Sequence, residues 1–117
     1  TTLKLRILFD DAMLGPGKAQ LLARIRDTGS ISAAGREMGM SYKRAWLLVE
    51  EMNSAFRDPL VAATGAAPGG GARLTEAGEA VLSLYAEILD RARRATADQI
   101  ALLEAMLRGG PDMSEGK

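Results

Sequence analysis

Residues 30–56 (SISAAGREMGMSYKRAWLLVEEMNSAF) constrain the fold more than any other stretch, because they predict two helices joined by a tight turn. Gly39 permits the positive φ that such a turn needs, and Ser41 is a natural N-cap for the second helix. We expect Trp46, the single tryptophan, to anchor the core. Apolar residues of the second helix recur three or four positions apart, as on one buried stripe: Tyr42, Ala45, Trp46, Val49, Met52 and Phe56.

The other side of this helix begins with Lys43 and Arg44, next to the positive end of the helix dipole. A helix that is buried on one side and presents Ser41, Lys43 and Arg44 from its first turn suits the major groove of DNA. We therefore expect residues 41–44 to contact DNA. The two basic residues could instead be an ordinary solvated face, and Tyr42 could either bond a phosphate or close the core.

The charge balance permits nucleic-acid binding without requiring it. The chain has 15 basic and 15 acidic residues, but residues 1–58 hold nine basic against seven acidic ones. Affinity for DNA follows local phosphate contacts, so basic residues gathered on one face suffice. In this half we expect Arg36 and Lys18 to touch the DNA backbone, although either could be ordinary surface.

Two residue types that enzymes depend on are missing, since the chain has no histidine and no cysteine. It therefore lacks the commonest general base, the commonest metal ligand and any thiolate. We expect no catalysis, no metal and no cofactor. The sequence has neither a signal peptide nor an apolar run of about 20 residues that would cross a bilayer, so we expect no membrane partner and a cytoplasmic location.

Strand patterns flank the helical region. Residues 3–9 alternate in polarity, residues 18–27 predict a first helix that stops at Gly29, and residues 60–64 and 73–74 predict two short strands around a glycine-rich tip. We interpret the tip as a wing that reaches DNA through Gly69, Gly70, Gly71 and Arg73. A plain flexible loop is the alternative. The N-terminal strand could add a third strand to this sheet.

Residues 75–107 predict a long helix capped by Thr75. Residues 96–99 resemble a capping box, so the helix is either continuous or broken near Thr96. Its apolar seam could be an intrachain core stripe, but its length favours pairing with a second copy. The seam alternates steps of four and three residues, and its predicted interface residues are Val81, Tyr85, Ile88, Ala92, Ala95, Leu102 and Met106.

The runs SISAA (30–34), GMSYK (39–43), AW (45–46), MN (52–53) and LTEAG (74–78) together resemble the N-terminal domain of ModE-type molybdate-responsive regulators. That domain is a winged helix-turn-helix related to the LysR-type one. The resemblance implies a homodimer whose long helices pair and whose recognition helices enter successive major grooves of a palindromic operator. Family members sense molybdate with further C-terminal domains, to which no residue here corresponds, so we expect no molybdate binding by this chain.

The sequence thus predicts a mostly α fold with a small β-sheet wing, a winged helix-turn-helix followed by a long dimerisation helix. We expect a DNA-binding domain in residues 1–74, the dimerisation helix in 75–108 and a disordered tail in 109–117. The predicted function is sequence-specific regulation of transcription by a homodimer on double-stranded DNA, with a link to molybdate metabolism. The alternative is a winged-helix module for protein–protein assembly.

Overall fold

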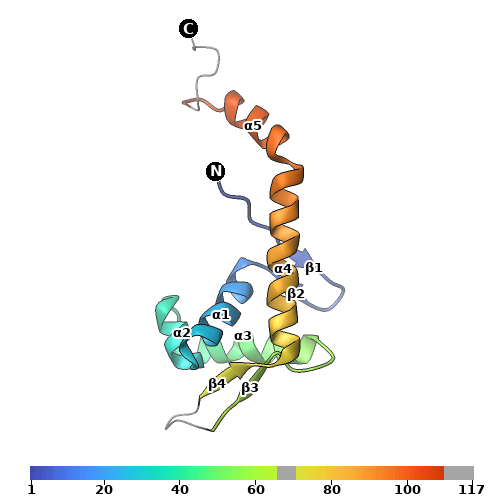
Figure 1. Cartoon of the computed structure of the whole chain (residues 1–117). Coiled ribbons are helices and arrows are strands. Elements are labelled where there is room, and N and C mark those ends of the chain that lie inside the picture. Colours follow the sequence, from blue (N-terminus) through green and yellow to red (C-terminus); the bar gives the residue numbers. More distant parts are fainter. Residues whose placement is uncertain (66–70, 110–117) are drawn as a thin grey trace.

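The computed structural model describes residues 1–65 and 71–109 of the chain. A helical domain carries two small β-sheets, and a long helix rises from it and bends near its end (Figure 1). This architecture confirms the predicted winged helix-turn-helix. In chain order the elements are β1 (Ile7–Leu8), β2 (Met13–Leu14), α1 (Pro16–Thr28), α2 (Ile31–Glu37), α3 (Tyr42–Ala55), β3 (Val61–Ala63), β4 (Ala72–Leu74), α4 (Glu76–Ala95) and α5 (Ala97–Met106).

The main core forms where α1, α2 and α3 meet the wing strands. Leu21, Leu22 and Ile25 of α1 are fully buried there, since their three- and four-residue spacing puts them on one helical face. From α3 the stripe contributes Val49 and Met52, each 1% exposed. This packing fixes the orientation of α3 relative to α1 and α2.

Local signals set the ends of the helices as the sequence predicts. Gly29 and Gly39 both have φ of 72°, a left-handed conformation that stops α1 and turns the chain into α3. The hydroxyl of Ser30 accepts from the Ala33 N–H at 3.0 Å, and that of Thr75 accepts from the Gly78 N–H at 3.0 Å. These caps hold donors that a helix start would otherwise leave unpaired.

The two sheets are separate, and the possible third wing strand does not form. β1 pairs antiparallel with β2, with Ile7 opposite Leu14, and β3 pairs antiparallel with β4, with Val61 opposite Leu74. The N-terminal segment finds its partner in its own hairpin, because residues 13–14 lie closer along the chain than the wing does. The wing is instead joined to the end of α1, where the Ala72 N–H donates to the Gly29 carbonyl at 2.9 Å.

The base of α4 packs closely on Leu60, the residue that directly precedes β3 of the wing. A Cβ atom at Gly78 would clash with the carbonyl oxygen of Leu60, so only glycine allows this approach. Leu60 also accepts a 2.9 Å bond from the Thr75 N–H. The start of α4 is therefore rigidly fixed to the winged domain.

The first part of the apolar seam on α4 faces its own chain. Tyr85 is 4% exposed and packs with Leu14 and Ala19, while Val81 is half-buried against both core clusters. Predicting Tyr85 as an interface residue is therefore wrong, because the N-terminal hairpin and α1 cover it. Val81 is only partly covered, and its place in an interface stays a prediction. Further along, Ala92 is half-buried, and four seam residues are exposed: Ile88, Ala95, Leu102 and Met106.

The long helix breaks at Thr96, which separates α4 from α5 (Figure 1). The predicted capping box does not form, since Thr96 makes no side-chain cap bond to α5. Its hydroxyl donates instead to the Ala92 carbonyl at 2.7 Å. This backward bond satisfies a terminal carbonyl of α4 and leaves the first amides of α5 without a side-chain cap. None of the helices in the described part of the chain is long and apolar enough to span a membrane.

Candidate nucleic-acid interface

Helix α3 begins at a tight turn and a side-chain cap. The hydroxyl of Ser41 accepts from the Arg44 N–H at 3.1 Å, which starts the helix at Tyr42. On the inner side, a Cβ atom at Gly35 of α2 would lie 3.0 Å from that of Ala45. The two helices therefore approach as closely as their backbones permit, which fixes α3 and turns its far side outward.

Lys43 and Leu47 point away from the domain. Both lie two residues from buried Ala45, about 200° around the helix, and Leu47 also lies two residues from buried Val49. The Leu47 side chain is 46% exposed, and Lys43 is also exposed. The outward face of α3 thus offers a cation and, one turn later, an apolar side chain.

One flank of this face is aromatic. Tyr42 is 52% exposed and Trp46 is 38% exposed, and the indole N–H of Trp46 donates to the phenolic oxygen of Tyr42. Predicting Trp46 as a core anchor is therefore wrong. The helical stripe is narrower than its apolar spacing indicates, because Ala45, Val49 and Met52 fill the contact with the core. The aromatic pair is left at the edge.

The opposite flank is basic. Arg44 lines a hollow of about 230 Å³ beside the start of α1, together with Arg6 from the N-terminal arm. The sequence patterns did not single out Arg6, because it belongs to an alternating segment far from α3 along the chain. Two arginines on one hollow raise the local positive potential beside the outward face.

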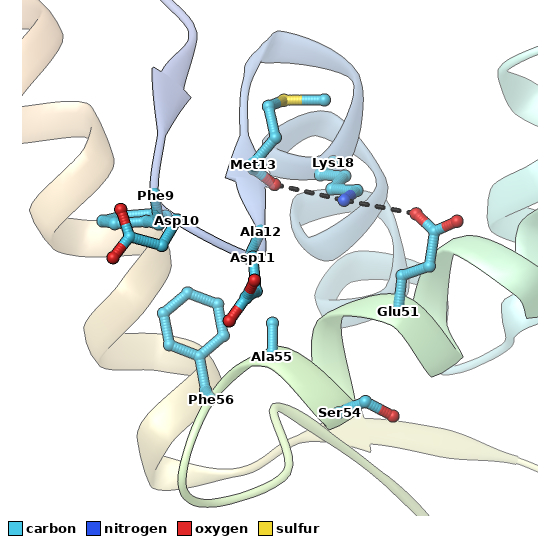
Figure 2. Close-up of a pocket in the computed structure, with 10 residues that line it drawn as sticks. All are labelled: Phe9, Asp10, Asp11, Ala12, Met13, Lys18, Glu51, Ser54, Ala55 and Phe56. Carbon is cyan, nitrogen blue, oxygen red and sulfur yellow. Dashed lines mark hydrogen bonds and ion pairs between the residues drawn. The ribbon is translucent and has the colours of Figure 1, made fainter.

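Lys18 lines the same hollow but is not proposed as a phosphate contact. Its Nζ donates to the Met13 carbonyl at 3.1 Å and lies 3.3 Å from the Glu51 carboxylate (Figure 2). The residue is 9% exposed. Its charge is thus engaged by α3 and the N-terminal hairpin, and the prediction that it touches the DNA backbone is withdrawn.

Figure 2 shows the open groove beside this ion pair, between the N-terminal hairpin and the end of α3. Its volume is about 1020 Å³. Asp10 and Asp11 border it, and Phe9 and Phe56 meet edge to face with ring centroids 6.4 Å apart. Because its carboxylates would repel phosphate, this groove is not part of the candidate interface.

The wing lies on the aromatic side of α3. Asn53 of α3 ties the two together: its Oδ1 accepts from the Leu60 N–H at 2.8 Å and the Val61 N–H at 3.1 Å, and its Nδ2 donates to the Val61 carbonyl at 3.1 Å. Arg73 of β4 is exposed. Of the predicted wing glycines, Gly71 is half-buried, and Gly69 and Gly70 lie outside the described residues.

Arg36 of α2 is exposed, and its Nη1 donates to the Ser32 hydroxyl at 2.9 Å. The structure thus brings together residues from four segments: the N-terminal arm, α2, α3 and the wing. Ser41, Tyr42, Lys43, Arg44 and Arg36 are all exposed here, on or near the start of α3. A DNA role for them remains a prediction.

Comparison with known proteins gives a family match. Residues 17–79, more than half of the chain, match the model for the lysR family of bacterial regulatory helix-turn-helix proteins. The matched segment runs from α1 to the first turn of α4 and includes all of α2, α3 and the wing. The family is one of regulators.

Curated relatives extend the similarity. The chain is 51% identical over 78 residues to the molybdenum-pterin-binding protein MopB of Rhodobacter capsulatus, covering 66% of this chain and 29% of that protein. It is 45% identical over 86 residues to the transcriptional regulator ModE of Yersinia pestis, covering 72% and 31%. It is 42% identical over 106 residues to the DNA-binding transcriptional dual regulator ModE of Escherichia coli K12, covering 86% and 39%. The ModE-type resemblance is confirmed, and the chain spans well under half the length of these relatives.

Proposed function

The chain belongs to the lysR family of bacterial regulatory helix-turn-helix proteins, and from this premise we propose that it binds duplex DNA sequence-specifically and regulates transcription in the cytoplasm. One observation carries the proposal. Helix α3 is capped at its start, is packed on one side and presents Lys43 and Leu47 on the other. A helix with these properties, beside a wing, has the form that enters a major groove.

In the proposed mechanism, phosphate contacts fix the register and side chains of α3 read base edges. Arg44 can make two parallel bonds to a guanine edge, and Leu47 can contact the methyl group of thymine. Arg36, Arg73 and Arg6 supply cations around this face. No chemical step is involved, in keeping with a family of regulators.

We propose further that the protein is a homodimer on a palindromic operator. Support comes from the exposed apolar side chains on α4 and α5: Leu84 is 58% exposed, Ile88 44%, Leu102 67% and Met106 80%. Such a face is commonly covered by a partner, and a second copy would place two α3 helices about one helical turn of DNA apart, or a multiple of it. In this scheme residues 1–74 bind DNA and 75–108 pair.

A link to molybdate metabolism is supported by the names of the relatives, one a molybdenum-pterin-binding protein and others ModE regulators. Binding of molybdate by this chain itself is not proposed. Addition of molybdate to the protein–DNA complex should therefore leave its affinity unchanged. A change would place an oxyanion site within these residues.

The first experiment selects bound duplexes from a random pool and measures the mass of the protein in solution alongside. An enriched inverted repeat together with a dimer mass is expected. Lys43→Glu should abolish enrichment, whereas Arg93→Glu makes the same charge change on an exposed α4 side chain, nine residues from Leu84 and thus on the opposite side of the helix, and should leave enrichment intact. Equal loss in both variants would contradict a role for the α3 face.

A protein-assembly module is the second candidate. It is favoured by the exposed Leu47 and Trp46, which a protein partner would also bury. Salt separates the two functions, because DNA binding weakens steeply as salt rises through counterion release. Absence of enrichment even at low salt would favour the assembly module.

A further inference from the structure

A small groove of about 100 Å³ lies between the start of α2, the outer flank of α3 and the stem of the wing. Two hydroxyl-bearing side chains border it, Ser32 from α2 and Tyr42 from α3. Trp46 lines it as well, and Ala63 and Gly71 close it from the wing side. The groove therefore joins the aromatic flank of α3 to the wing, along the edge of the proposed DNA-binding face.

Both hydroxyl oxygens already accept a hydrogen bond from a neighbour one helical turn away. Trp46 donates its indole N–H to the Tyr42 oxygen, and Arg36 donates from Nη1 to the Ser32 oxygen at 2.9 Å. A hydroxyl has a single proton to donate. Within residues 1–65 and 71–109, no acceptor is recorded for either proton, so both are available for a ligand.

The matching ligand is an anion that accepts hydrogen bonds and donates none. A phosphodiester group has this chemistry, and the Arg36 guanidinium beside Ser32 adds a positive charge. The position between recognition helix and wing is where a strand of a bound duplex would pass. A neutral ligand that only donates hydrogen bonds would leave both hydroxyl protons without an acceptor.

We propose that Tyr42 and Ser32 hold one backbone phosphate of the bound DNA, and that Trp46 is a positioning residue. By occupying the acceptor side of the Tyr42 oxygen, the indole directs the phenolic proton toward the phosphate. This proposal rests on the proposed DNA binding and assigns three residues of the same face to register rather than to base reading.

The proposal predicts a distinctive pattern in a variant. Tyr42→Phe removes a neutral donor, so affinity should fall about tenfold, as for loss of a hydrogen bond to a charged group. The loss should be equal for all sequences, and the slope of affinity against salt should stay the same because no charge is removed. Arg36→Ala, by contrast, should lower that slope.

A double-mutant cycle tests the positioning role of Trp46. Trp46→Phe alone should weaken binding by about threefold, and it should have no further effect in the Tyr42→Phe background, because there is then no hydroxyl to orient. Thermal unfolding of each variant accompanies the binding data. Since both rings are exposed, the midpoints should stay close to that of the unchanged protein.

Trp46 also serves as the probe, since it is the only tryptophan of the chain. Its fluorescence should change on titration with the selected duplex, in the unchanged protein and in Ser32→Ala. Inorganic phosphate at matched ionic strength should produce no such change, since free phosphate gains nothing from the neighbouring contacts to DNA. A change with free phosphate alone would overturn the assignment to the DNA backbone.

Three further outcomes would overturn the proposal: full affinity in Tyr42→Phe, a loss confined to certain base pairs, or additive effects in the cycle. Each of these outcomes is judged by comparing the DNA affinity of the variant with that of the unchanged protein. If the unchanged protein bound no duplex at all, the proposed function would fail first, and the two failures are thus distinguishable.

Discussion

The phenolic hydroxyl of Tyr85 in α4 donates a 2.6 Å hydrogen bond to the backbone carbonyl of Leu5. The two residues are far apart in the chain, so this bond fastens the N-terminal arm along α4. The ring itself is 4% exposed and packs with Leu14 and Ala19. Part of the apolar face of α4 is therefore covered by its own chain, which shifts any dimer contact toward α5.

Tyr85→Phe should lower the free energy of unfolding by about 0.5–1.5 kcal/mol, because it deletes one hydrogen bond while keeping the packed ring. Urea denaturation followed by circular dichroism measures the change. The mass in solution should be unaltered. A variant that turned monomeric would show that Tyr85 contributes to the interface after all.

Ile88→Glu should weaken the proposed dimer and, with it, operator binding. Ile88 is 44% exposed and lies on the uncovered apolar face, where a buried carboxylate would be costly. Sedimentation over a range of protein concentrations measures the effect. Ala86→Glu is the matched control, since it adds the same charge on the opposite side of α4. An unchanged sedimentation profile for Ile88→Glu would rule out pairing through this face.

Asn53→Ala should destabilise the domain by about 1–3 kcal/mol, because it leaves the amides of Leu60 and Val61 without their side-chain acceptor. Asn53→Asp keeps that acceptor, but it replaces the 3.1 Å bond from Nδ2 to the Val61 carbonyl with a repulsive contact between a carboxylate oxygen and that carbonyl. The Asp variant should therefore lie between the Ala variant and the unchanged protein in urea denaturation. If the Asp variant were less stable than the Ala variant, the loss of the hydrogen bond donated by Nδ2, with the repulsion that replaces it, would outweigh the two bonds accepted by Oδ1.

Gly78→Ala should destabilise the protein by about 1–3 kcal/mol through overpacking, although alanine is the better helix former by about 1 kcal/mol. The added methyl group would meet the Leu60 carbonyl. Gly17→Ala in α1 is the control, since a Cβ there meets nothing within 4 Å. Equal stability changes in the two variants would contradict the close approach at Gly78.

Arg44→Ala should relax sequence preference at one base pair per half-site, at a cost of about 1–3 kcal/mol, as expected for a bidentate contact to guanine. Binding to a set of single-substitution duplexes measures it. A loss that was uniform across the set would make Arg44 a phosphate contact. The basic hollow that it shares with Arg6 would then be the place of that contact.

Much of the fold follows from local sequence. Ser41 and Thr75 each cap a helix as predicted, and Gly29 and Gly39 take the positive φ that ends one helix and turns into another. Such signals are legible because cap and capped amide lie within three residues of each other. The same proximity explains the N-terminal hairpin, which pairs locally rather than with the wing.

The candidate site was less predictable. The helical stripe on α3 predicted a buried Trp46, but spacing alone does not reveal how wide the contact with the core is. Lys18 was expected at the surface because lysine usually is, and its burial depends on Glu51, from another helix. Arg6 carried no local signal, since its relation to Arg44 exists only in three dimensions.

The sequence by itself determined the caps and turns at most helix ends, the order of helix, turn, helix and wing, and the family, but it left the break at Thr96 open. Those features depend on neighbours within a turn or two of the chain. Only the tertiary structure decided which apolar residues are covered and which remain for a partner, because coverage depends on segments far apart in sequence. Tyr85 does not lie on the exposed part of the seam, because its hydroxyl is bonded to the Leu5 carbonyl of the N-terminal arm. Trp46 lies outside the core and donates a hydrogen bond to Tyr42 at the edge of the groove.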